Sequence, residues 1–163
     1  MRYIALLRGI NVGGKRIIKM QDLRAMFVAA GARDVETYIQ SGNVVFGHAR
    51  PTAARFEKEI ANQTGLDVQV ILRTADEWAA LKHPFDDDDH VHVFFLAAKA
   101  SVDVEALAPE RYVVKNREVF LYLPDGMGRS KLAAAIGRAL PTATARNWRT
   151  VQQLHAMAIQ SVR

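Results

Sequence analysis

A glycine-rich segment near the start of the chain is the first part whose residues could do chemistry. Gly9 to Lys15 (GINVGGK) has the spacing G-x-x-x-x-G-K, which in phosphate-binding loops cradles the phosphates of a nucleotide. Arg16 stands where that motif needs a hydroxyl group to hold magnesium, and helical periodicity begins only near Met20. We therefore predict that magnesium-dependent nucleotide hydrolysis is absent.

The same segment allows a looser anion site. The glycines Gly13 and Gly14 permit exposed backbone N–H groups, and the nearby side chains of Arg8, Lys15 and Lys19 add positive charge. Asn11 lies between these groups. The alternative is a long connection whose lysines are simply solvated, and the residues alone leave both interpretations open.

A second polar segment, Gln40-Ser41-Gly42-Asn43, lies between two predicted strands. Gly42 and Asn43 are typical of a tight hairpin turn, which needs residues that tolerate positive φ. A turn has less need of Gln40 and Ser41, whose side chains could hydrogen-bond a ligand.

The last quarter of the chain holds the remaining candidates. Ser130 precedes a predicted helix, where it is either an N-cap or, with the neighbouring Lys131, part of an anion site at the helix N-terminus. Arg146 and Asn147 adjoin Trp148, so guanidinium groups could bind phosphate while the indole stacks on a base. Alternatively, Trp148 packs in the core and Asn147 caps the last helix.

One segment contains residue types that bind metals: the four aspartates Asp86 to Asp89 and the histidines His83, His90 and His92. Four consecutive aspartates cannot converge without a special loop, so we expect a solvated acidic loop and neither metal nor cofactor. Covalent catalysis has no support, because the chain lacks a G-x-S-x-G elbow.

The charge of the chain is unevenly distributed along its 163 residues. Residues 1–50 carry eight Lys/Arg against three Asp/Glu, residues 51–110 five against twelve, and residues 111–163 nine against two. Basic ends and an acidic middle are consistent with a shared positive cleft for an anionic ligand, or with chance distribution over a solvated surface.

Composition limits the class of protein. The chain has no cysteine, so disulfides and thiolate chemistry are excluded. No apolar run approaches the ~20 residues of a membrane helix, and the first residues do not resemble a signal peptide. We expect a cytoplasmic protein that does not bind membranes, while its oligomeric state stays open.

Apolar periodicity predicts helices near 20–30, 52–64, 130–139 and 148–158. Residues 35–40 should pair antiparallel with 43–47, and 112–114 with 119–123. Thr74 and Glu77 form a predicted capping box, and 102–108 is a predicted short helix.

The resulting element order predicts an α+β fold. Two ferredoxin-like βαββαβ halves with antiparallel sheets are followed by a C-terminal helix. We expect an N-terminal lobe at 1–73, a helical linker with the acidic loop at 74–89, and a second lobe with the terminal helix at 90–163. No residue-level repeat is evident between the halves, so their duplication rests on element order alone.

Three segments together carry a family resemblance: Ile4 to Arg24 (IALLRGINVGGKRIIKMQDLR), Tyr38 to Phe46 (YIQSGNVVF) and Arg146 to Val151 (RNWRTV). They resemble domain of unknown function 1697 (DUF1697) along essentially the whole chain. The resemblance implies a compact α+β fold with ferredoxin-like halves and implies no established activity.

The leading hypothesis is a cytoplasmic binding module that holds a phosphate-bearing ligand, either a nucleotide or a nucleic acid, in a basic cleft. The alternatives are a small enzyme that uses Lys15 or Lys131 to stabilise charge on an anionic metabolite, and a structural or interaction protein. No catalytic residue is assigned. The expected ligand-binding residues are Arg8, Asn11, Gly13, Gly14, Lys15, Lys19, Gln40, Ser41, Asn43, Ser130, Lys131, Arg146 and Asn147.

Overall fold

The computed structural model of the chain describes residues 1–160. These residues form two units: residues 1–81 with the part of the last helix that starts at Gln153, and residues 82–152. Each unit contains one four-stranded antiparallel sheet, and each is described separately below.

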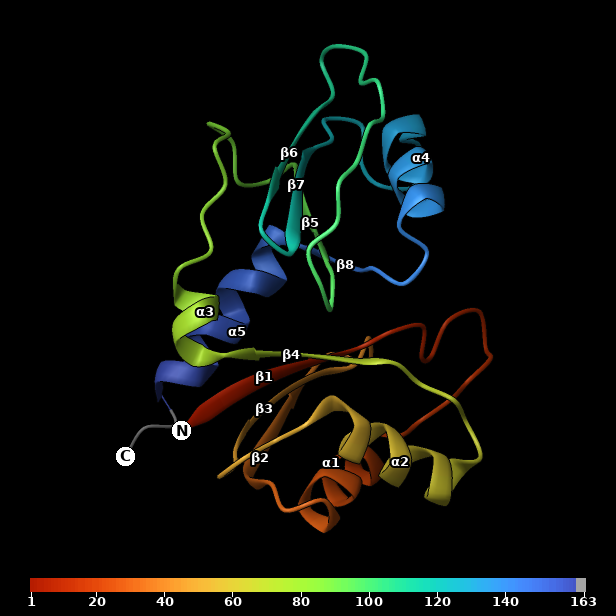
Figure 1. Cartoon of the computed structure of the whole chain (residues 1–163), viewed down its shortest axis with the longest axis vertical. Coiled ribbons are helices and arrows are strands. Elements are labelled where there is room, and N and C mark those ends of the chain that lie inside the picture. Colours follow the sequence, from red (N-terminus) through yellow and green to blue (C-terminus); the bar gives the residue numbers. More distant parts are fainter. Residues whose placement is uncertain (161–163) are drawn as a thin grey trace. The chain divides into compact units, whose positions relative to one another are not determined.

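The first sheet has the strand order β2-β3-β1-β4, and the helices α1 and α2 cover one of its faces (Figure 1). The elements of this part of the chain are β1 (Arg2–Leu7), α1 (Met20–Ala29), β2 (Arg33–Tyr38), β3 (Asn43–Gly47), α2 (Ala53–Thr64), β4 (Val70–Thr74) and α3 (Ala75–Ala79). The predicted antiparallel pairing of 35–40 with 43–47 is confirmed, although the strand ends at Tyr38 and residues 39 and 40 belong to the turn.

In the first unit, the helices form where the sequence predicts them. In α1, the residues at helical spacing, Leu23, Met26 and Phe27, are buried. The α2 helix begins after Thr52, whose hydroxyl accepts a hydrogen bond from the Arg55 N–H, and ends at a left-handed glycine. The capping box of α3 is confirmed by two reciprocal hydrogen bonds between Thr74 and Glu77.

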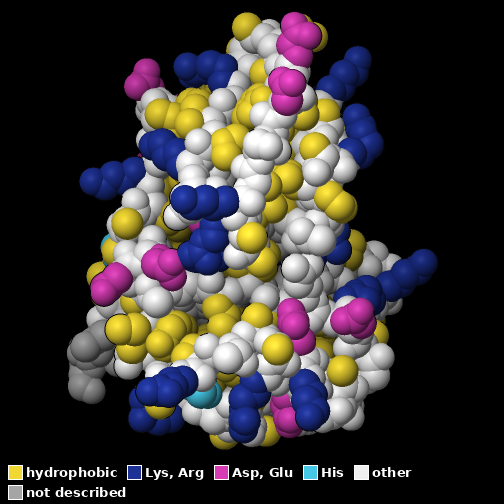
Figure 2. Space-filling model, in the orientation of Figure 1, with side chains coloured by type: hydrophobic (Ala, Val, Ile, Leu, Met, Phe, Trp, Pro, Cys, Tyr) yellow, Lys and Arg dark blue, Asp and Glu magenta, His cyan; other side chains and the backbone are white. Residues whose placement is uncertain are grey.

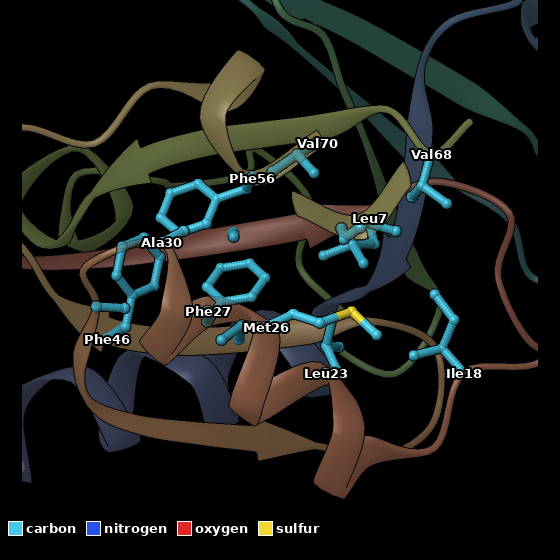
Figure 3. Close-up of a cluster of buried hydrophobic side chains, with 14 of the residues drawn as sticks. Leu7, Ile18, Leu23, Met26, Phe27, Ala30, Phe46, Phe56, Val68 and Val70 are labelled. Atoms are coloured by element: carbon cyan, nitrogen blue, oxygen red, sulfur yellow. The ribbon is translucent and has the colours of Figure 1, made fainter. Parts of the chain in front are cut away.

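Three phenylalanines form the centre of the first core (Figure 3). The rings of Phe27 and Phe56 stack with their centroids 4.3 Å apart, and Phe46 meets both rings edge-on at 5.3 and 5.1 Å. One ring comes from each helix and one from β3, so this cluster fixes α1 and α2 to the sheet.

The second sheet repeats the order of the first, as β6-β7-β5-β8. Its unit contains β5 (Val91–Phe95), β6 (Arg111–Lys115), β7 (Glu118–Tyr122), α4 (Lys131–Ala139), β8 (Thr144–Asn147) and the first residues of α5 (Trp148–Gln160). The predicted helices at 130–139 and 148–158 are confirmed, as is the hairpin made by β6 and β7.

The predicted helix at 102–108 is wrong, because this segment has no helical structure. Val102, Val104 and Ala106 pack against the second core, while the residues between them are exposed. Inward residues at every second position need an extended chain, since helical spacing would turn some of them outward. The Tyr112 hydroxyl holds the segment by bonding both the N–H and the carbonyl of Val104.

Each sheet has a buried arginine on its last strand, opposite the third residue of the neighbouring central strand. Arg73 in β4 lies opposite Ile4, and Arg146 in β8 lies opposite Val93, each on the sheet face away from the covering helices. Each guanidinium donates from Nη1 to the carbonyl of the preceding residue, at 3.0 and 2.8 Å. The two halves therefore share a residue-level correspondence that sequence comparison does not reveal.

The chain is a two-half ferredoxin-like α+β protein. The first half has the predicted βαββαβ order, whereas the second half has no helix between β5 and β6, because residues 102–108 are extended. Within residues 1–160, no helix has both the length and the apolar character needed to cross a membrane.

Candidate functional site

The glycine-rich segment folds as a small hairpin. The Asn11 N–H donates to the Arg16 carbonyl and the Lys15 N–H to the Val12 carbonyl, both at 3.0 Å. Gly13 and Gly14 occupy the turn with φ of 59° and 72°. Positive φ at both central residues is the signature of a type I′ turn, which explains both glycines. The helix α1 begins only at Met20, so its N-terminus does not follow the loop directly as in a nucleotide-binding P-loop.

Asn11 ties this hairpin to the neighbouring turn. Its side-chain amide donates to the carbonyls of Ile18 and Gln40 at 3.0 and 2.8 Å, and its carbonyl oxygen accepts from the Ile18 N–H at 2.8 Å. The amide nitrogen and the amide oxygen of Asn11 both bond backbone groups, so this side chain anchors the loop.

Replacing Asn11 with alanine should lower the free energy of unfolding by about 2 kcal/mol, since three hydrogen bonds of about 1 kcal/mol each are only partly replaced by water. Hydrogen exchange at the Ile18 amide should also become faster, because its N–H loses the Asn11 oxygen as its acceptor. The matched control is Asn62→Ala on the exposed face of α2, which should change stability by less than about 0.5 kcal/mol. Unchanged Ile18 exchange in the Asn11 variant would contradict the anchoring role.

Arg16 is a second anchor, and the sequence interpretation missed it. Its Nε donates to the Gly9 carbonyl at 2.9 Å and its Nη2 to the Asp67 carbonyl at 2.7 Å. The residue also has a φ of 54°, which is uncommon outside glycine. The sequence carried no signal for this role, because the carbonyl of Asp67 comes near only after β4 has paired.

The hairpin's remaining cations are exposed. Arg8, Lys15 and Lys19 lie at its surface, together with two large apolar side chains, Val12 and Ile17, that are each 64% exposed. Neither lysine side chain makes a hydrogen bond or ion pair with any residue in the range 1–160.

Arg8 also lines a cavity of about 410 Å³ next to the hairpin, with Arg16, Glu57, Asp67 and Gln69. The Glu57 carboxylate accepts a hydrogen bond from the Val70 N–H at 2.8 Å. Two carboxylates among two guanidiniums leave this cavity without the uniform positive charge that a bare phosphate would require.

A turn between the two strands is confirmed, but it spans residues 39–42 and not the predicted Ser41-Gly42-Asn43. Positive φ occurs at Ile39 (50°) and Gly42 (87°), whereas Asn43 begins β3 and is fully buried. The Asn43 amide donates to the Tyr38 carbonyl and to the Ser41 hydroxyl, both at 2.9 Å, so its role is to close the turn. A β-branched residue at positive φ is strained, and Ile39 is also half-exposed.

Among the candidates of the second unit, Ser130 and Asn147 are helix caps. The Ser130 hydroxyl accepts from the Ala133 N–H at 2.9 Å at the start of α4, and the Asn147 carbonyl oxygen accepts from the Thr150 N–H at 2.9 Å in α5. Lys131 is exposed and lines a cavity along α4 with two further cations, Arg129 and Arg138, and three carboxylates.

Arg146 does not lie on an exposed basic face but is buried in β8. Its Nη1 donates to the Thr144 hydroxyl and the Ala145 carbonyl at 2.8 Å, and burial lowers the pKa of Arg146 to about 10. The group is still charged at neutral pH. Since the side chain points away from solvent, the basic character of residues 146–149 at the surface comes from Arg149.

The acidic loop is held by histidines. Asp88 bonds the His83 ring at 2.7 Å and Asp87 bonds the His90 ring at 2.6 Å, and the second bond lowers the pKa of Asp87. Throughout the described range, no group of three or more His, Asp or Glu side chains is arranged to hold a metal ion.

The expected site residues thus form separate groups. Asn11 and Gln40 are joined by a hydrogen bond, and Lys15 and Lys19 share the hairpin segment, whereas Ser130, Lys131, Arg146 and Asn147 belong to the second unit. That the hairpin and residues 146–149 share one cleft stays a prediction. Figure 2 shows cations interspersed with acidic and hydrophobic side chains over the visible face.

Comparison with known proteins supports a family assignment. Over 97% of its length, the chain resembles a solved structure titled "The structure of conserved bacterial protein SP0830 from Streptococcus pneumoniae", with a TM-score of 0.79, 25% identity and coverage of 98% of that chain. A comparison with curated proteins gave no match. Residues 1–120 match the family described as protein of unknown function (DUF1697). This match spans more than half of the sequence, and the chain therefore belongs to the DUF1697 family.

Proposed function

We propose that this protein binds single-stranded nucleic acid and that Lys15 and Lys19 of the glycine hairpin contact its phosphates. The observation that carries the proposal is the combination, on one anchored segment, of two exposed lysines with two exposed apolar side chains, Val12 and Ile17. Cations that track the phosphate backbone are one element of sequence-tolerant binding to single strands. The hairpin has no aromatic ring for base stacking, so Val12 and Ile17 would offer the bases only an aliphatic surface.

The rigidity of the hairpin supports this function. The hydrogen bonds of Asn11 and Arg16 fix both ends of the segment before any ligand arrives. Binding to a pre-organised loop avoids the free-energy cost of ordering it. The lysine side chains, which have no partner within residues 1–160, give up no intramolecular bond when they meet a phosphate.

The exposure of the hairpin favours an extended ligand over a free nucleotide. Small-molecule sites enclose most of their ligand's surface, whereas Lys15, Val12 and Ile17 project from the protein. The adjoining cavity that holds Arg8 is a poorer phosphate site, because Glu57 and Asp67 line it as well.

The test is fluorescence anisotropy of a labelled single-stranded oligonucleotide at several salt concentrations. The double variant Lys15→Ala/Lys19→Ala should bind about tenfold more weakly near 0.1 M salt. The slope of log K against log salt should fall by about 1.4, because each lysine–phosphate pair accounts for about 0.7 of the slope on a single strand. The salt dependence of wild-type binding should itself be modest, because only a few phosphates are engaged.

The matched control is the double variant Lys58→Ala/Lys99→Ala, which removes two exposed lysines elsewhere and has the same net charge. It should retain the wild-type salt slope. Equal losses of affinity in both double variants would mean that only net charge matters, and absence of oligonucleotide binding by the wild type would refute the proposal.

A further inference from the structure

A polar cavity of about 280 Å³ lies entirely within the second unit, where the end of β8 meets the first turn of α5. Its walls include Asp88, Asp89, His92, Trp148, Arg149 and Gln152. The sequence gives no sign that the aspartates and the tryptophan lie together, because residues about 60 positions apart are joined here only by the pairing of β5 with β8.

Local structure positions each wall of this cavity. His92 in β5 lies opposite Asn147 in β8, which brings the acidic loop beside the start of α5. The bond between Asp88 and the His83 ring holds the loop, and the His83 ring also packs edge-on against the indole of Trp148 at 4.7 Å. The indole is therefore fixed in place while it remains partly exposed.

The chemical groups in the cavity are complementary to a planar heterocycle. The indole offers a flat apolar surface for stacking, Asp89 offers hydrogen-bond acceptors, and Arg149 offers donors. Arg149 Nη2 and Asp89 Oδ1 form an exposed ion pair at 3.9 Å, so adjacent edges of one ring could reach the two groups. The His92 Nδ1 atom is buried with no hydrogen-bond partner among residues 1–160, so a polar group in this wall is unsatisfied.

Among the common bases, guanine matches this arrangement. Its N1–H and N2 amino group donate on one edge, and its O6 and N7 accept on another. A carboxylate accepts from the first edge and a guanidinium donates to the second. Adenine has no N1–H group for the carboxylate and presents an amino group at the position that faces the arginine.

We infer that this cavity binds an unpaired guanine base, with Trp148 stacking on the ring, Asp89 accepting from N1–H and the N2 amino group, and Arg149 donating to O6 and N7. The inference rests on the proposed function in that it assigns a base preference to a protein that binds single strands. It involves no residue of the glycine hairpin.

Nucleosides provide the test, because they have no phosphate and so do not depend on Lys15 or Lys19. In isothermal titration calorimetry, the wild-type protein should bind guanosine at least tenfold more tightly than adenosine, since a bidentate contact discriminates by about 1–3 kcal/mol. Inosine, which differs from guanosine by the absence of the N2 amino group, should bind with intermediate affinity.

The variant Asp89→Asn should lose most of the preference for guanosine over adenosine, and Trp148→Ala should weaken binding of every nucleoside. Asp103→Asn, an exposed aspartate in the same unit but outside the cavity, should behave as the wild type. Equal binding of guanosine and adenosine, or a guanosine preference that survives Asp89→Asn, would overturn the inference. Failure of guanosine to bind, while oligonucleotide binding still depends on Lys15 and Lys19, would overturn the base site and leave the proposed function intact.

Discussion

Replacing Phe27 with alanine should lower the free energy of unfolding of the first unit by about 4 kcal/mol, the typical cost of truncating a buried phenylalanine. The side chain is fully buried, stacks on Phe56 at 4.3 Å and meets the edge of Phe46 at 5.3 Å. Its removal takes away the burial of a ring and leaves a cavity between both helices and the sheet, which the remaining rings can fill only by leaving their own packed positions (Figure 3).

Urea denaturation measures this effect, and a Trp148→Phe background makes it specific to the first unit. Trp78, the chain's other tryptophan, lies in α3 of that unit and then reports its unfolding. The control is Val28→Ala, the adjacent helical position, whose side chain is 58% exposed and whose truncation should cost less than about 0.5 kcal/mol. A decrease below about 1 kcal/mol for Phe27→Ala would mean that the phenylalanine cluster does not hold the unit together.

Replacing Gly42 with alanine should destabilise the same unit by about 3 kcal/mol, through two effects. The residue has a φ of 87°, a region in which an L-residue costs about 1–2 kcal/mol. A Cβ atom added there would also lie 2.8 Å from the Leu7 Cβ and 3.1 Å from the Ile10 Cδ1 atom. Both neighbours are buried, so relief requires a shift of β1 against the turn, and overpacking of this kind adds about 1–3 kcal/mol.

Gly65→Ala separates the two effects. Gly65 also has a positive φ, of 74°, but a Cβ atom there would meet no other atom within 4 Å. Its replacement should therefore cost only the backbone term, about 1 kcal/mol, in the same urea experiment. Equal destabilisation by Gly42→Ala and Gly65→Ala would show that the contact with Leu7 adds nothing.

The hairpin and the cavity in the second unit are proposed to bind different parts of a nucleic acid. The hairpin proposal concerns phosphates and predicts a salt dependence that Lys15 and Lys19 control. The cavity proposal concerns a base and predicts a nucleoside preference that Asp89 controls. Nucleosides carry no phosphate, so the lysine variants should leave nucleoside binding unchanged, and the cavity variants should leave the salt slope of oligonucleotide binding unchanged, unless the protein unfolds.

The sequence by itself determined most of the secondary structure. The spacing of Leu23, Met26 and Phe27 specified α1, and the Thr74–Glu77 capping box specified the start of α3. These signals are local, since a helix repeats every 3.6 residues and a cap acts within one turn. The strand order within each half followed from the ferredoxin-like element order, and the two halves do share one sheet order.

Only the tertiary structure decided which polar residues are free to act. Asn11, Asn43 and Arg146 resemble ligand-binding residues in the sequence, yet each is engaged with backbone carbonyls in the fold. The alternation of apolar and acidic residues at 102–106 (VDVEA) indicates an extended segment, but apolar residues at 102 and 106 also fit helical spacing, and only contact with the second core decides between the two. A side chain's hydrogen-bond partners are fixed by chain segments far away in sequence, such as Asp67 for Arg16, and these segments come within reach only when the sheet has formed.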